Sequence, residues 1–191
     1  MRFSTRARVW LLLLAAIGCA RRAPQPVPPL PTGQPAPAEL RQRYSGTYVY
    51  AGGDAERASV AAAVNRAVEP MSSFARGFAR NALMERAEIR DFFIISFDDK
   101  GNVSVVSPRE FPEVSPSDGT PVRVTNRFGD QTELSQRFVD GVLVQRGRSE
   151  SGGGTTTFEL RPGGQTLRVH RVMESSQLPR PVEYTLTYKR Q

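Results

Sequence analysis

The chain has 191 residues, a formal net charge of +7, one cysteine and one histidine. A single cysteine excludes a disulfide framework, and a single histidine leaves a zinc or copper site short of ligands, so we expect neither a metal nor a cofactor. The first 22 residues contain five arginines and no acid, which leaves about +2 on the remainder, too little for a nucleic-acid-binding surface.

Residues 1–18 have the pattern of a secretion signal. Three arginines at positions 2, 6 and 8 precede the apolar run of residues 9–18. A transmembrane helix needs about twenty apolar residues, so this run is too short to span a bilayer. We therefore expect residues 1–18 to be a signal peptide that is removed.

Ala16-Ile17-Gly18-Cys19 resembles the lipobox of bacterial lipoproteins, although that family prefers leucine where Ala16 stands. The resemblance implies that the thiol of Cys19 receives a diacylglycerol and that the new amine is acylated, for example with palmitate. In that family the absence of aspartate after the cysteine, here Ala20, favours the outer membrane. We expect a lipid-anchored envelope protein whose domain faces the periplasm or the cell exterior. The alternative is ordinary secretory cleavage after Ala20.

Residues 24–37 include seven prolines in fourteen positions, a composition that favours extended polyproline II. We interpret residues 19–38 as the lipidated cysteine and a proline-rich tether. Residues 39–191 then form one domain, which is long enough to bury a core without a disulfide.

The domain begins with a β-rich segment, residues 44–50, which ends at a pair of glycines. Asp54 can cap a helix that runs to about residue 68, and Ser72 or Ser73 can start a second helix that runs to about residue 87. Phe74 and Phe78 are among the apolar positions of the second helix. The sequence thus predicts a helical pair after the first strand.

After residue 90 the sequence alternates short β-rich segments with turn residues. Residues 108–120 contain three prolines and fit a loop or a weak edge strand, while Gly152-Gly153-Gly154 fits a flexible turn. We expect strands over residues 92–97, 102–107, 122–126, 131–138, 142–148, 155–160, 165–173 and 182–189.

Most of these connections are too short for a crossover, so the strands should be antiparallel neighbours. We predict a mainly β fold, an antiparallel up-and-down barrel of about eight to ten strands with the helical pair inserted after the first strand.

This order of elements resembles the fatty-acid-binding proteins of the wider lipocalin-like (calycin) group. Three patches carry the resemblance: Gly46-Thr47-Tyr48, Val142-Leu143-Val144-Gln145-Arg146 and the closing segment, residues 185–190. The resemblance implies a barrel with a lipophilic ligand inside, in which Arg146 and Tyr188 bind the carboxylate. Leu186 replaces the family's second arginine, so a fatty-acid carboxylate would lack one charge-assisted partner.

Strand alternation adds further candidates, because residues two apart share a face. Arg146 shares a face with two valines, and both Arg171 and Gln136 share faces with apolar residues. We hypothesise that Arg146, Arg171, Gln136 and Tyr188 orient a ligand in an apolar pocket. The alternative is that each lies at a strand end that faces solvent.

The sequence contains no nucleophile elbow, phosphate-binding loop or dinucleotide fingerprint, so we expect no enzyme. The preferred interpretation is a membrane-anchored lipoprotein that binds a small lipophilic ligand inside its barrel. The alternative is a structural or protein-interaction lipoprotein whose barrel is filled by its own side chains.

Overall fold

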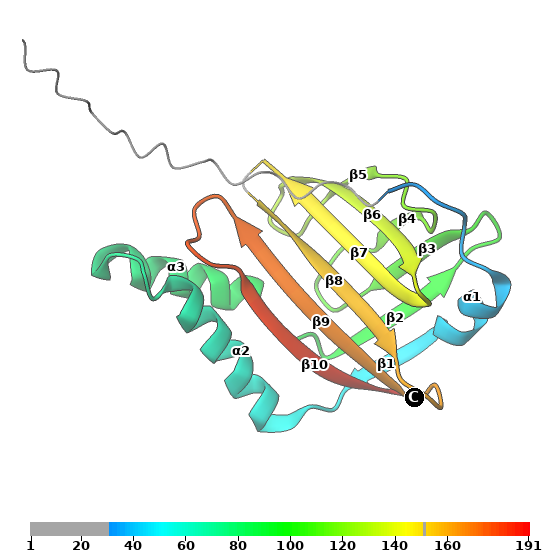
Figure 1. Cartoon of the computed structure of the whole chain (residues 1–191), viewed down its shortest axis with the longest axis horizontal. Coiled ribbons are helices and arrows are strands. Elements are labelled where there is room, and N and C mark those ends of the chain that lie inside the picture. Colours follow the sequence, from blue (N-terminus) through cyan, green and yellow to red (C-terminus); the bar gives the residue numbers. More distant parts are fainter. Residues whose placement is uncertain (1–30, 151) are drawn as a thin grey trace, which may run out of the picture.

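The computed structural model describes residues 31–150 and 152–191 (Figure 1). The expected signal peptide and the lipidation of Cys19 lie outside the described residues. Within these residues, no helix is long and apolar enough to cross a membrane.

Ten antiparallel strands form one sheet in the order β4-β3-β2-β1-β10-β9-β8-β7-β6-β5, which curls into a nearly closed barrel (Figure 1). Strands that follow one another pair along most of the chain, and β1 also pairs with β10. The predicted up-and-down barrel is confirmed. The strands are β1 (Gly46–Tyr50), β2 (Phe92–Phe97), β3 (Asn102–Val106), β4 (Glu113–Pro116), β5 (Val122–Thr125), β6 (Gln131–Val139), β7 (Val142–Ser149), β8 (Gly152–Leu160), β9 (Thr166–Ser175) and β10 (Val182–Arg190).

The barrel is incomplete because β4 and β5 are the two edges of the sheet. An isolated β-bridge joins Asp118, in the loop between them, to Arg137 on β6. Residues 31–37, the N-terminal strap, lie against this region. The Gly33 N–H donates to the Asp118 carbonyl at 2.7 Å, and the Ala36 N–H donates to Ser117 Oγ at 2.9 Å. The end of the proline-rich segment is therefore packed against the barrel.

A short helix, α1 (Ala38–Tyr44), precedes β1 and lies at the end of the barrel opposite α3 (Figure 1). The Tyr44 hydroxyl donates to the Gly141 carbonyl at 2.9 Å and accepts from the Leu160 N–H at 3.3 Å. The predicted start of the first strand at residue 44 is wrong, because this buried contact holds Tyr44 in the helix.

The predicted helical pair is confirmed as α2 (Gly53–Val68) and α3 (Ser73–Arg86). Ser72 accepts a hydrogen bond from the Ala75 N–H at 3.5 Å and caps α3. The predicted apolar face of α3 is only partly buried, because Phe74 and Phe78 are 95% and 82% exposed. Helix α2 packs more closely and buries Val60, Ala63, Val64, Ala67 and Val68.

The glycines predicted as a turn, Gly152 to Gly154, instead belong to β8. A Cβ atom on Gly154 would lie 2.7 Å from the Val172 carbonyl oxygen on β9. The close backbone approach of the two strands therefore requires glycine at this strand position.

Candidate ligand-binding cavity

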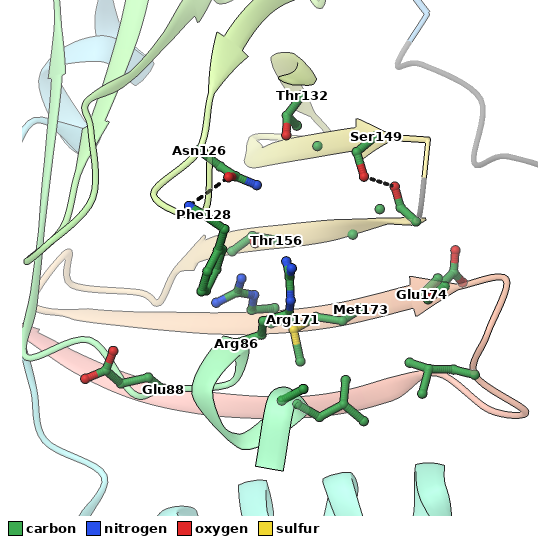
Figure 2. Close-up of a pocket in the computed structure, with 18 of the residues that line it drawn as sticks. Arg86, Glu88, Asn126, Phe128, Thr132, Ser149, Thr156, Arg171, Met173 and Glu174 are labelled. Carbon is green, nitrogen blue, oxygen red and sulfur yellow. Dashed lines mark hydrogen bonds between the residues drawn. The ribbon is translucent and has the colours of Figure 1, made fainter. Parts of the chain in front are cut away.

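A cavity of about 770 Å³ opens into the barrel beneath α3. Residues near its mouth include Phe78 of α3, Phe128 of the β5–β6 turn, Ser149 at the end of β7 and Leu178 of the β9–β10 turn. Figure 2 shows Arg171 and Met173 side by side on β9, with Thr156 on the neighbouring strand. The volume is in the range of pockets that hold small organic ligands.

A row of five polar side chains crosses the inside of the barrel from β6 to β10. The register pairs Gln136 with Gln145, Gln145 with Thr156, Thr156 with Arg171, and Arg171 with Tyr184. All of these except Gln136 line the cavity, whereas Gln136 is fully buried. We call these residues the polar row.

The glutamines of the polar row are held by a continuous set of hydrogen bonds. Gln136 Nε2 donates to Gln145 Oε1 at 2.7 Å, and Ser115 Oγ donates to Gln136 Oε1 at 2.8 Å. Gln145 Nε2 in turn donates to Glu113 Oε2 at 2.7 Å. Buried amides are costly without partners, so this network fixes one end of the row.

Arg171 is the charged member of the polar row. Burial acts to lower the pKa of its guanidinium, but Tyr184, Glu113 and Glu110 outweigh burial and raise the pKa, so the side chain stays charged. Among the described residues, no carboxylate forms a salt bridge with Arg171 at 4.0 Å or less. A hydrogen bond joins Arg171 to Tyr184, but a guanidinium carries several N–H donors, so others can reach a ligand in the cavity.

The other arginines near the inner wall are already paired. Arg90 is 7% exposed and contacts Glu110, and its Nη1 lies 3.0 Å from Glu88 Oε2. Arg127 Nη1 lies 2.9 Å from the same Glu88 oxygen. A hydrogen bond from Arg127 is the largest cause of the lowered pKa of Glu88. These pairs balance the charges of Arg90 and Arg127, whereas Arg171 lines the cavity without a salt bridge among the described residues.

Glu113 is the acidic group nearest the polar row. Burial raises the pKa of its carboxyl group, while the hydrogen bond from Gln145 and the charge of Arg171 partly oppose this rise. The carboxyl group contacts the polar row through its hydrogen bond from Gln145.

Two residues along each strand from the polar row, away from the mouth, the side chains that face the inside of the barrel are apolar. It pairs Leu143 with Phe158, Phe158 with Val169, and Val169 with Leu186, and all four side chains are buried. Phe93 packs on Phe158 with ring centroids 5.4 Å apart. The cavity therefore offers one charged band next to an apolar base.

The structure brings two of the predicted site residues, Arg171 and Gln136, into the polar row. Tyr188 lines the cavity at the apolar base, where its hydroxyl donates to the Arg90 carbonyl at 3.0 Å and burial raises its pKa. Arg146 lies on the outer face of β7, because Leu143 and Gln145 occupy the inward face. The inward orientation predicted for Arg146 is corrected, and its neighbour Gln145 takes the inward position.

Sequence reasoning missed Gln145, Thr156, Tyr184 and Glu113. The first three follow from Arg171 once the hairpin register is known, so pairing was the signal that could have found them. Glu113 lies in the segment assigned to a loop or weak edge strand, and no local pattern orients its side chain.

No group of three histidine, cysteine, aspartate or glutamate residues in the described ranges is placed to hold a metal ion.

No protein-family model matches the sequence, and no curated protein matches it. Solved structures with a similar fold include Echinococcus granulosus fatty-acid-binding protein 1, with 10% identity and a TM-score of 0.49 over 78% of this chain and 98% of that one. A Schistosoma mansoni fatty-acid-binding protein in complex with arachidonic acid has 10% identity and a TM-score of 0.49 over 80% and 98%. The fluorescent protein UnaG has 13% identity and a TM-score of 0.49 over 78% and 98%.

Proposed function

We propose that this protein binds one small lipophilic molecule with an acidic head group inside its barrel, without catalysis. Arg171 carries the proposal, because its charged guanidinium faces a cavity of about 770 Å³ and forms no salt bridge among the described residues. A carboxylate held by a guanidinium away from bulk water forms a strong, charge-assisted hydrogen bond.

The apolar part of the ligand would contact the cavity walls. The apolar lining includes Phe93 from β2 and Phe158, Met173 and Leu186 from the neighbouring strands β8, β9 and β10. Burial of an apolar body here supplies affinity, while the polar row sets the orientation of the head group. The cavity volume speaks against a barrel filled by its own side chains.

We extend the proposal to the N-terminus. The lipobox-like residues around Cys19 support a lipid anchor, and Ala20 supports placement in the outer membrane, with the barrel facing the periplasm or the cell exterior. Labelling cells with a palmitate analogue tests the anchor. Incorporation that disappears in Cys19→Ser supports it, and equal labelling of both proteins overturns it.

Native mass spectrometry of the full chain, followed by lipid extraction, tests ligand binding. We expect a co-purifying acidic lipophile whose occupancy falls at least about tenfold in Arg171→Gln, since charge-assisted bonds contribute about 1.5–3 kcal/mol. Arg146→Gln removes an arginine from the outer face of the same barrel and should leave occupancy unchanged. A ligand-free chain that also ignores added oleic acid would overturn the proposal.

A further inference from the structure

We infer that the ligand is an acidic lipophile whose apolar body is a fused ring system, broader than a single acyl chain. The inference rests on the proposed function, because it places the acid at Arg171 and asks what shape of body fits beside it.

On the mouth side of the polar row, part of the cavity wall is formed by glycines. Two residues along the strands from Thr156 and Arg171, toward the mouth, the register pairs Gly154 with Gly147 on β7 and with Met173 on β9. One further step pairs Gly152 with Ser149 and Ser175. All of these residues line the cavity. We call Gly147, Gly152 and Gly154 the glycine wall.

The backbone explains only part of the glycine wall. At Gly152 a Cβ atom would lie 2.3 Å from the Glu174 carbonyl oxygen, so this position needs glycine to let the strands approach. Gly147 differs, because its φ is not positive and the nearest atom to a Cβ would be Thr132 Cγ2 at 3.3 Å. A Cβ atom at Gly147 would therefore press on the Thr132 side chain and not on backbone, and a larger side chain there would extend into the cavity that both residues line.

Two phenylalanines on α3 line the same cavity. Phe74 and Phe78 are one helical turn apart and almost fully exposed. Large exposed aromatic side chains are costly in water and gain free energy when an apolar surface covers them. A ring system gives these side chains an aromatic or alicyclic face to pack against, and the glycine wall leaves room for it.

A single acyl chain suits this space less well. One chain beside the glycine wall would leave unfilled volume and lose dispersion contacts on one side. A flexible chain also loses more conformational freedom on binding than a rigid ring body does. The head group does not separate the two ligand classes, because both carry a carboxylate for Arg171.

Isothermal titration calorimetry of the delipidated full chain tests this inference with two probes, abietic acid, which has three fused rings, and oleic acid, which has one straight chain. We expect abietic acid to bind at least about tenfold more tightly. Gly147→Leu should weaken abietic acid by about tenfold or more and oleic acid by less than about threefold, because it narrows the cavity. Val144→Leu adds bulk on the outer face of the same strand and should change neither affinity.

Oleic acid binding as tightly as abietic acid, or an equal loss of both in Gly147→Leu, would overturn the inference. If oleic acid binds in an Arg171-dependent manner and abietic acid does not, the proposed function stands and the ring inference fails. If neither acid binds, the proposed function fails and the inference fails with it. The wild-type affinities decide the question even if Gly147→Leu does not fold.

Discussion

The side-chain amide of Gln145 donates a 2.7 Å hydrogen bond to the carboxylate of Glu113, which joins β7 to β4 across the inside of the barrel. These strands are not neighbours in the sheet. The bond therefore links the two sides of the incomplete barrel at the level of Arg171. Stability and ligand binding should depend on the same network.

Gln136→Leu should lower the free energy of unfolding by about 2 kcal/mol, because Ser115 and Gln145 each lose a buried partner. Urea unfolding measures the change. Gln165→Leu is the control at an exposed position and should stay within about 0.5 kcal/mol of wild type. Equal effects at both positions would contradict the role of the network.

Glu113→Gln should change how stability depends on pH. Burial raises the pKa of Glu113 above its ordinary value of 4.5, so the folded chain holds this proton to a higher pH than the unfolded chain. The stability that this group contributes is therefore complete below pH 4.5, and it is lost as the pH rises through the pKa of Glu113 in the folded chain. Glutamine keeps an oxygen acceptor for Gln145 and does not titrate.

Urea unfolding of both proteins from about pH 4 to about pH 8 tests this sign. The stability of wild type relative to Glu113→Gln should fall as pH rises. A difference that is constant, or that grows with pH, would show that Gln145 and Arg171 outweigh burial.

Tyr44→Phe should cost about 1–2 kcal/mol of unfolding free energy, because the Gly141 carbonyl and the Leu160 N–H lose their hydroxyl partner. Thermal or urea unfolding measures it. Tyr50→Phe removes a more exposed hydroxyl bond, to the Gly53 carbonyl at 3.0 Å, and should cost less. The reverse order would mean that α1 does not stabilise its end of the barrel.

Ser117→Ala should loosen the N-terminal strap, because the buried hydroxyl accepts from the Ala36 N–H and donates to the Gly101 carbonyl. We expect a loss of about 1 kcal/mol and faster hydrogen exchange at the Ala36 amide. Ser176→Ala, at an exposed turn position, should change neither quantity. Unchanged exchange at Ala36 in Ser117→Ala would show that the strap is held by other contacts.

The sequence was sufficient for the helical pair, the order of the strands and the inward side of β9. Turn residues mark the strand ends, and on β9 only one face is apolar, so alternation places Arg171 inward. Gln136 was placed for the same reason. Local chemistry is enough wherever the two faces of a strand differ clearly.

The tertiary structure decided the rest. On β7 both faces begin with apolar residues, so the face of Val142 and Val144 suggested that Arg146 points inward. Only the pairing of Gln145 with Gln136 on β6 shows that the other face points inward. Phe74 and Phe78 have the spacing of a buried face, yet their burial depends on how closely α3 approaches the barrel. Glu113 meets Gln145 and Arg171 only after the whole sheet has closed. Such contacts join residues far apart in the chain, and no local pattern encodes them.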